Sequence, residues 1–388
     1  MFEDILHPAL SDFVQYWAAW NIVKSGGNPY DIPTMLSMQN SLGRLGDYPL
    51  MMYNPPWLLT LLSPILSFDF SYSVAIFLAF NVLLIILQAK ILSSAYLEKL
   101  DQKKLPIVLL LMLTFPPLLV ALYLGQVSII LSLACIAVYW GLTKHHYPIT
   151  GVSLSILTIK PQLFFLLFLL ILWWSVQNKN YKILIVASLF LAGLLCFLLL
   201  QSTTLLFQWV DFVRSETLMK YASGTFPGFL SFVIFPGSHS LGLLYGITFL
   251  PSLLVSVGFL LYCIIKQPSI NWETMYPSIL CISIFTAPYG WFFDFTALIL
   301  VYVLLIFDLI GGKRRARLIF GISLLVSIMC VVLIILGVRD YHYYFIVPLL
   351  YFLIFQYRNW EARKGLADSY QRYRSNGLIK RYEQYLIF

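Results

Sequence analysis

Residues 182–201 read KILIVASLFLAGLLCFLLLQ, and the only charged side chain among them is that of Lys182. A helix needs about 20 such residues to cross the roughly 30 Å of hydrocarbon in a bilayer. This run therefore predicts a membrane-spanning helix that is apolar on every side.

The rest of the chain shares this character: of 388 residues, 60% are hydrophobic and 11% are charged, and the mean hydropathy is +0.83. Soluble globular proteins do not need so much apolar surface, so lipid is the expected solvent for most of the chain. The five cysteines lie inside apolar runs, which predicts buried thiols without a disulfide framework or a metal-ligand spacing.

Apolar runs of similar length recur at about 72–96, 105–123, 127–142, 182–201, 242–266, 291–310, 318–337 and 342–357. A shorter run covers 274–288. The stretch 148–176 is interrupted by Lys160-Pro161 and predicts two short helices that meet at a break. With those halves counted separately, the sequence predicts an all-α polytopic membrane protein with a bundle of about eleven transmembrane helices.

The 25 Lys and Arg exceed the 17 Asp and Glu, but the basic residues gather in short loops on one side of these runs, which favours membrane topology over nucleic-acid binding. That side is predicted to be cytoplasmic. We expect three regions. Residues 1–71 form an outward catalytic loop and enter the membrane, 72–357 form the transmembrane domain with an outward loop at 202–241, and 358–388 form a basic cytoplasmic tail. Export of the first region needs a preceding helix, so one N-terminal helix is expected to be missing.

Asp12 lies in the outward segment and is followed by the aromatic residues Phe13, Tyr16 and Trp17. A carboxylate held at a membrane surface can take a proton from a hydroxyl group, so a membrane enzyme is one hypothesis. The alternative is structural, because Asp12 followed by Gln15 is a capping-box pattern in which the carboxylate caps the helix. Position alone leaves both hypotheses open.

Lys160 lies in a mostly apolar stretch, where a charged side chain usually faces a cavity or pairs with an anion. Pro161 breaks the helix, and a break within the membrane is tolerated mainly where it lines a protein cavity. If both half-helices enter from the cytoplasmic side, Lys160 lies near the outer surface and could contact a lipid phosphate. The alternative is an ammonium group that snorkels to the interface.

Two further outer turns carry candidate residues. Gln126 follows Gly125, and its amide either satisfies the turn or meets a sugar hydroxyl. Asp294 follows the turn that contains Tyr289, and its carboxylate could cap the next helix, hold a cation or bind a sugar hydroxyl.

The remaining candidates have strong structural alternatives. Asp31 follows Asn28-Pro29-Tyr30 and is more typical of a turn former. Tyr53 is expected to anchor the chain at the membrane interface. Arg214 and Lys220 belong, with Asp211 and Glu216, to a set whose 3- and 4-residue spacings suit an amphipathic helix lying on the membrane. His342 stands alone in a short turn and is more typical of a structural residue.

Five features occur in order along residues 12–294. They are Asp12, then Gly27-Asn28-Pro29-Tyr30-Asp31, Tyr53-Asn54-Pro55-Pro56, Gly125-Gln126 with Gly151 to Lys160-Pro161, and Pro288-Tyr289 with Asp294. Together they resemble the family 87 glycosyltransferases, membrane enzymes of the GT-C class. Two departures are visible. The helix expected before the first-loop aspartate is absent, and Phe292-Phe293-Asp294 stands where mycobacterial members that make phosphatidylinositol mannosides carry histidines.

The resemblance implies transfer of a hexose, usually mannose, from a polyprenyl-phosphate sugar to a lipid or glycan acceptor on the outer face, with inversion. Asp12 would be the general base. The donor phosphate would be bound by Lys160, Arg214 and Lys220. The other substrate-binding candidates are Tyr16, Asp31, Tyr53, Gln126, Tyr289, Asp294 and His342. A monophosphate leaving group does not require a metal, so no metal and no other cofactor are expected.

The expected partners are the lipid-linked donor, the acceptor and membrane lipids, with no nucleic acid, in a plasma membrane that is more typically bacterial than archaeal. Walker, dinucleotide, zinc and nucleophile-elbow motifs are missing from the sequence. Two other classes stay open. A flippase for a lipid-linked sugar would show two related halves, and no repeat is visible. A glycan polymerase or ligase would have an arginine-rich outward loop, whereas 202–241 holds one arginine.

Overall fold

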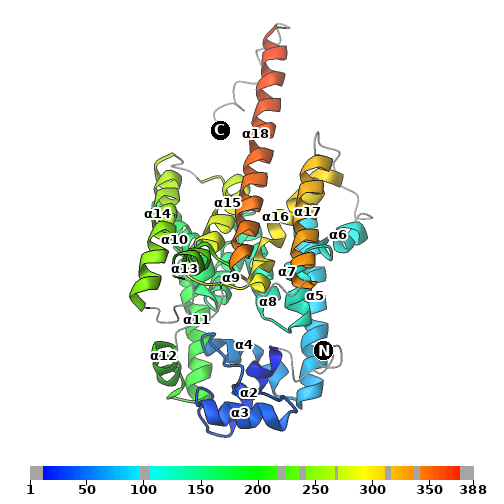
Figure 1. Ribbon diagram of the computed structural model, residues 1–388. Helices are drawn as coiled ribbons and strands as arrows, with labels where there is room; N and C mark the ends of the chain where they lie inside the picture. The colour runs from blue at the N-terminus through cyan, green and yellow to red at the C-terminus, as the bar shows by residue number, and fades with distance from the viewer. Residues whose placement is uncertain are drawn as a thin grey trace.

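The computed structural model describes residues 12–96, 105–215, 223–235, 242–266, 270–310, 316–335 and 341–375. In these ranges the chain forms α-helices and two short 3₁₀ helices, with no β-strand (Figure 1). The all-α class predicted from the sequence is confirmed.

The first helices in the chain are α2 (Phe13–Lys24), α3 (Ile32–Ser41), α4 (Trp57–Leu66), α5 (Phe70–Tyr96), α6 (Leu105–Met112), α7 (Pro116–Tyr123), α8 (Ser128–Thr143), α9 (Tyr147–Leu157) and α10 (Pro161–Gln177). They are followed by α11 (Lys182–Gln201), α12 (Leu205–Ser215), α13 (Phe226–Ile234), α14 (Gly242–Lys266), α15 (Trp272–Phe285), η4 (Phe292–Leu298), α16 (Ile299–Ile310), α17 (Ala316–Ile335), η5 (Tyr341–Phe345) and α18 (Ile346–Ser375).

Five described helical segments are long and apolar enough to cross a membrane: Phe70–Ser94, Lys182–Gln201, Gly246–Ile265, Phe292–Ile310 and Ala316–Leu333. A sixth is added if the bent pair α6 and α7 forms one span. The eleven predicted crossings are not confirmed, because α8, α9 and α10 are apolar but shorter than the roughly 20 residues that a crossing needs.

The run 105–123, predicted as one span, consists of two helices bent by 75° at their junction. Pro116-Pro117 begins the second helix, and Phe115 before it has extended backbone, with φ −93° and ψ 104°. A proline disfavours helical geometry in the residue that precedes it, so the chain turns at this point.

The break predicted at Lys160-Pro161 is confirmed, since α9 ends at Leu157 and α10 begins at Pro161. Close packing on α11 fixes the first of these half-helices. A Cβ on Gly151 would lie 2.7 Å from the carbonyl oxygen of Ile183. Gly151 therefore allows α9 and α11 to cross in contact.

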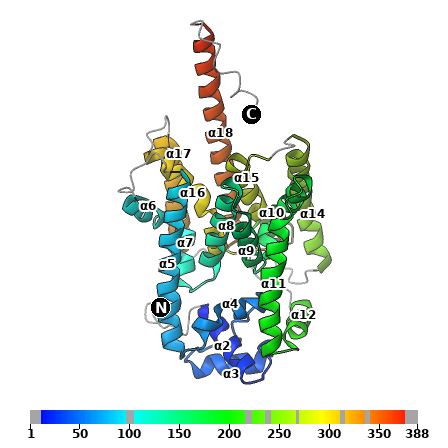
Figure 2. The same ribbon diagram turned by 180° about the vertical axis from the view of Figure 1, so that it is seen from behind.

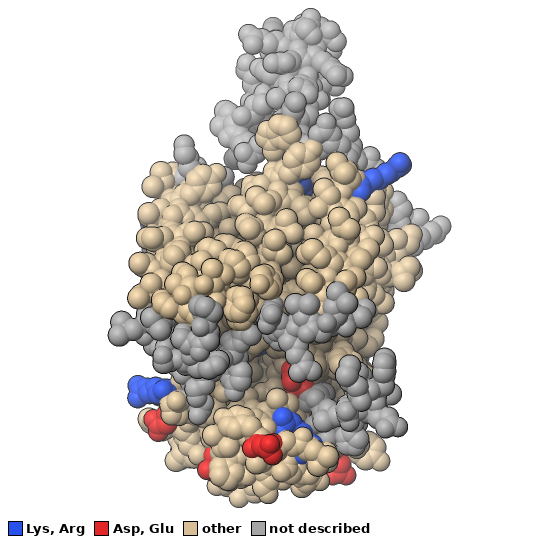
Figure 3. Space-filling view, in the orientation of Figure 1, with Lys and Arg blue, Asp and Glu red and all other residues tan. Residues whose placement is uncertain are grey.

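The helices α2, α3, α4 and α12 lie together at one end of the molecule, and we call them the end layer (Figure 1). The C-terminal half of α18 projects from the opposite end, as the reverse view also shows (Figure 2). On the face drawn in Figure 3, the described charged side chains gather toward these two ends, and the described surface between them is mostly uncharged. This distribution fits an uncharged belt in lipid, with the end layer at one membrane surface.

The apolar helices differ in what surrounds them. In the most apolar part of α11, 11% of the residues are buried in the protein. In the segment formed by η4 and α16 together, 83% are buried. The first is therefore a peripheral helix whose apolar surface suits contact with lipid. The second is the centre of the bundle, and the candidate site lies at its beginning.

Near the other end of α16, Arg358 on α18 forms a two-point ion pair with Asp308. Its Nη2 lies 3.1 Å from Oδ1 of the carboxylate. A guanidinium held by both oxygens fixes orientation as well as distance, so this pair ties α18 to the central segment.

Candidate active site

A cavity of about 590 Å³ lies between the end layer and the helix bundle. Side chains from α2, the α3–α4 loop (residues 42–56), α12 and three turns of the bundle form its walls. The cavity-lining residues that the sequence predicts as site residues are Asp12, Tyr16, Tyr53, Gln126, Lys160 and Tyr289. Segments far apart in the chain therefore meet around one space.

Asp12 precedes α2, but its side chain does not cap the helix. Its Oδ2 instead accepts a hydrogen bond from Nε2 of Gln126, at 2.5 Å. The Oε1 of the same amide accepts from the hydroxyl of Tyr16, at 3.1 Å. The capping interpretation is therefore wrong for this carboxylate. Because the Tyr16 hydroxyl binds the amide oxygen of Gln126, the amide nitrogen is the end that faces Asp12.

Gly125 determines where this amide lies. Its backbone has φ +64°, a left-handed conformation that glycine adopts without a steric penalty. A Cβ at this position would lie 2.9 Å from Cβ of Phe13. The turn between α7 and α8 therefore rests directly on the first residue of α2, and this contact brings Gln126 to Asp12.

Burial raises the pKa of the Asp12 carboxyl above its ordinary value. The hydrogen bond from Gln126 and the charges of Lys160 and Arg44 lower it, but they do not cancel the effect of burial. A desolvated carboxylate is a stronger base than one in water. Burial also raises the pKa of Tyr16 well above its usual value, so this side chain donates as a neutral phenol.

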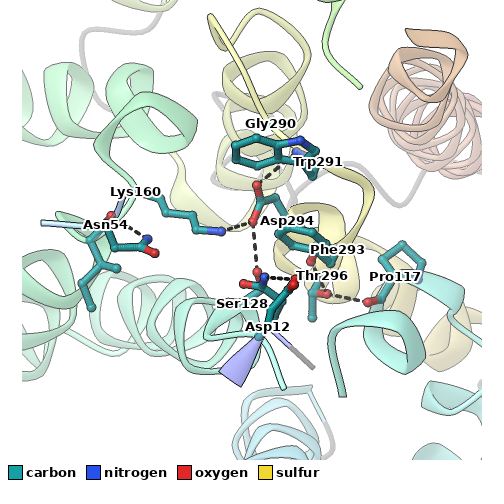
Figure 4. Close-up of polar contacts among 12 residues, drawn as sticks. Asp12, Asn54, Pro117, Ser128, Lys160, Gly290, Trp291, Phe293, Asp294 and Thr296 are labelled. Carbon is teal, nitrogen blue, oxygen red and sulfur yellow. Dashed lines mark hydrogen bonds and ion pairs between the residues drawn. The ribbon is translucent and has the colours of Figure 1, made fainter. Parts of the chain in front are cut away.

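Lys160 forms the second polar centre, with Nζ 2.5 Å from Oδ1 of Asp294 (Figure 4). Ser128 donates its hydroxyl to the same oxygen at 3.0 Å, and the backbone N–H of Trp291 donates to Oδ2 at 3.1 Å. The two charged residues are 5% and 2% exposed. An isolated buried charge would be costly, and this pairing offsets the cost. The snorkelling interpretation is wrong, because the ammonium is buried.

The Lys160 ammonium lies between the carboxylate and the cavity. Lys160 and Phe293 line the cavity, with Nζ 5.0 Å from the centre of the phenylalanine ring. Asp294 is not among the residues that line it. The carboxylate therefore binds the ammonium on the side away from the cavity, and the ring makes a cation–π contact with it.

Aromatic side chains form much of the remaining wall. Trp209 on α12 donates its indole N–H to the carbonyl of Tyr53 at 3.2 Å, and its ring centre lies 5.9 Å from that of Trp57. Tyr289 lies on another part of the wall, and burial raises its pKa to about 12. Apolar rings with a few convergent polar groups are typical of pockets for organic ligands.

Asp31 lies outside this cavity and is exposed. Its carboxylate caps α3, accepting from the backbone N–H of Thr34 at 3.0 Å. The hydrogen bonds from the side chain and backbone of Thr34 lower the pKa of Asp31. This contact agrees with the structural role, as a turn former, that the sequence favours for Asp31.

Three other predicted residues are not placed at the cavity. Arg214 is exposed on α12 and does not line it, although its neighbour Val213 does. His342 stacks on Phe232, with ring centres 4.4 Å apart. Lys220 lies outside the described residues.

Arg44, Ser128 and Trp209 are among the polar residues of the site that sequence reasoning missed. The hydroxyl of Ser128 and the indole of Trp209 belong to no motif that singles them out. Arg44 offered a signal, since it is the only arginine in the outward segment 1–71. It lines the cavity next to Tyr48.

Among the described residues, no group of three or more His, Cys, Asp or Glu side chains could hold a metal ion. The described positive charges at the cavity come from Lys160 and Arg44.

The sequence profile of glycosyltransferase family 87 matches residues 52–336, which include Gln126, Lys160 and Asp294. The match begins after Asp12. No curated protein and no solved structure matches the chain. Because the family profile covers more than half of its length, the chain belongs to glycosyltransferase family 87 and is a membrane glycosyltransferase.

Proposed function

We propose that the protein transfers a hexose, with mannose the first choice, from a polyprenyl-phosphate sugar to a hydroxyl of a lipid or glycan acceptor. The observation that carries this proposal is the placement of the Asp12 carboxylate and the Lys160 ammonium on one cavity beside the apolar bundle. A donor with its lipid tail in the bilayer could bring its sugar phosphate to that position.

In the proposed reaction, the acceptor oxygen forms a bond to the anomeric carbon while its proton passes to Asp12. The bond between that carbon and the phosphate oxygen breaks on the opposite face, and the lipid phosphate leaves with the electron pair. The anomeric configuration is thereby inverted. The raised pKa of Asp12 favours this role, because a base gains driving force for proton transfer as its pKa rises toward the working pH.

Lys160 would stabilise the negative charge that grows on the departing phosphate. Asp294 would keep its ammonium in position, and Ser128 would hold the carboxylate, since its hydroxyl donates to the same Oδ1 that binds Lys160. No metal or other cofactor is needed for this step, because the leaving group is a monophosphate.

Substrate contacts are proposed for Tyr16, Tyr53, Gln126, Tyr289 and Asp294, all at or directly behind the cavity wall. Phosphate contacts by Arg214 and Lys220, and sugar contacts by Asp31 and His342, stay predictions from the sequence. We place the end layer on the outer face of a plasma membrane, as the distribution of basic residues predicts, with residues 1–71, 72–357 and 358–388 as the three regions.

The test is sugar transfer from radiolabelled polyprenyl-phosphate mannose in membranes that contain wild-type protein or Asp12→Asn. The variant keeps the side-chain shape but removes the base, so we expect transfer to fall by about 10²–10⁴-fold. Asp69→Asn is the matched control, because Asp69 is exposed and lies outside the cavity.

Loss of transfer with Asp12→Asn alone, at equal protein levels, would support the assignment. Equal transfer by wild type and Asp12→Asn would refute Asp12 as the base. Transfer of glucose or another hexose, but not mannose, would keep the mechanism and correct the sugar.

A further inference from the structure

Arg44 is a second cation at the cavity, and its surroundings differ from those of Lys160. Its Nη1 donates to the carbonyl oxygen of Tyr48 at 2.8 Å. Among the described residues, no carboxylate lies within ion-pair distance of it, whereas Lys160 is bound to Asp294. A guanidinium has five N–H donors, so Arg44 retains several for a ligand.

The loop that carries Arg44 is fixed to α3. Gln39 is fully buried, and its amide donates to the carbonyl of Leu50 at 2.7 Å and accepts from the Leu50 N–H at 2.9 Å. The N–H of Arg44 donates to the backbone carbonyl of Gln39 at 3.2 Å, just after Gly43 reverses the chain with φ +87°. The guanidinium is therefore presented from an anchored backbone, which lowers the entropic cost of binding a ligand.

We infer that Arg44 binds the phosphate of the lipid-linked donor and keeps hold of it as that phosphate leaves. A planar guanidinium can donate to two phosphate oxygens at once, which an ammonium group cannot do. Burial lowers the pKa of Arg44, as expected for a cation that has lost part of its hydration before any ligand binds. This inference rests on the proposed function, for which it names the group that recognises the leaving phosphate.

The two cations would then have different tasks. The charge of Lys160 is compensated by Asp294 before the donor enters, so Lys160 attracts an incoming anion less strongly than Arg44 does. The charge of Arg44 also faces that of Asp12, whose pKa it lowers. When the acceptor proton neutralises Asp12, negative charge moves from this carboxylate to the phosphate. Arg44 stays beside the phosphate and stabilises the product side of the reaction.

The experiment measures binding of geranylgeranyl monophosphate to the purified full-length protein in lipid nanodiscs, followed by tryptophan fluorescence. Trp57, Trp209 and Trp291 line the cavity and supply the signal. Geranylgeraniol, which has the same tail without phosphate, and inorganic phosphate, which has no tail, are the companion ligands. The variants are Arg44→Gln, Arg44→Lys and, as a control, Lys24→Gln, whose side chain is exposed at the end of α2.

We expect Arg44→Gln to weaken monophosphate binding about 10- to 100-fold, as for lost hydrogen bonds to a charged group. Arg44→Lys should be intermediate, Lys24→Gln should bind as wild type does, and geranylgeraniol should bind equally to all four proteins. Equal monophosphate binding by wild type and Arg44→Gln would overturn the inference. Displacement of the lipid by inorganic phosphate at equal concentration would also overturn it, because the site would then serve free phosphate.

Asp12→Asn separates this inference from the proposed function. It should bind the monophosphate at least as tightly as wild type, because it removes a negative charge near Arg44, while losing sugar transfer. If binding depends on Arg44 but no polyprenyl-phosphate sugar serves as a donor, the proposed function fails and the lipid-phosphate site stands. If transfer occurs and Arg44→Gln changes neither binding nor transfer, the function stands and the inference fails.

Discussion

Two carboxylate–cation pairs lie within the described part of the bundle, at opposite ends of the central segment formed by η4 and α16. Lys160 and Asp294 meet at its beginning, beside the cavity, and their side chains are 6% and 0% exposed. Arg358 and Asp308 meet near its end, and theirs are 19% and 9% exposed. The first pair uses one ammonium contact supported by a hydroxyl and a backbone N–H, and the second uses two guanidinium contacts.

This difference separates a site from a structural clamp. The ammonium of Lys160 has a carboxylate on one side and the cavity on the other, so one direction remains for a ligand. The Arg358 guanidinium uses two of its nitrogens to join two helices and lies away from the cavity. A buried lysine that faces a cavity suits transient interaction with an anion, and a bidentate arginine suits a permanent link.

Among the tests of this comparison, the largest effect should come from Lys160→Met, which removes the ammonium but keeps an unbranched side chain. We expect transfer to fall by about 10²–10³-fold, the range seen when one group that stabilises developing charge is lost. Radiolabelled transfer, corrected for protein level, measures it. Because this change leaves Asp294 buried without its cation, the double variant Lys160→Met/Asp294→Asn should recover stability but not transfer.

A second test breaks the other pair. Arg358→Met should lower the free energy of unfolding by about 2–3 kcal/mol, because the charged hydrogen bonds between α18 and α16 are lost. Thermal unfolding in detergent measures the change, and residual transfer per folded molecule should equal that of wild type. If Arg358→Met abolished transfer in a folded protein, the division between site and clamp would be wrong.

The smallest effect sharpens the description of the site. Transfer requires ionised Asp12. The rate should therefore be low at pH values below the pKa of this carboxyl and should increase as the pH rises through it. The hydrogen bond from Gln126 lowers that pKa, so Gln126→Leu should move the midpoint of the rate profile to higher pH.

Tyr16→Phe should also move the midpoint to higher pH, but by less. It removes the hydrogen bond that orients the Gln126 amide and leaves the amide itself in place. Asn40→Leu, exposed on α3, should leave the midpoint unchanged. An unchanged midpoint in Gln126→Leu would mean that the base in the reaction is another group.

Sequence reasoning could predict the parts of this molecule that depend on local chemistry. Composition predicts the all-α membrane class, and Pro161 predicts the break after Lys160. The bend at Pro116-Pro117 was missed although its signal was present, because an apolar run read by hydropathy alone conceals a change of direction. The eleven predicted crossings are not confirmed either, because hydropathy alone does not distinguish a helix that spans the bilayer from an apolar helix in the protein interior.

Partners across the chain could not be predicted. Nothing near Lys160 in the sequence indicates Asp294, and nothing near Asp12 indicates that Gln126 will hold it. These contacts depend on how the helices pack, and packing involves side-chain shapes that a single sequence does not disclose. Arg44 has no motif around it, and only the fold of the α3–α4 loop places it at the cavity.

The separation of 134 positions between Lys160 and Asp294 has a consequence for biosynthesis. A ribosome completes Lys160 long before the carboxylate that will neutralise it exists. An unpaired ammonium is costly in hydrocarbon, so α9 and α10 should keep their junction in contact with water or lipid headgroups until η4 follows. Formation of the ion pair is thus a late event in membrane integration, and newly made chains gain a working site only after η4 has been inserted.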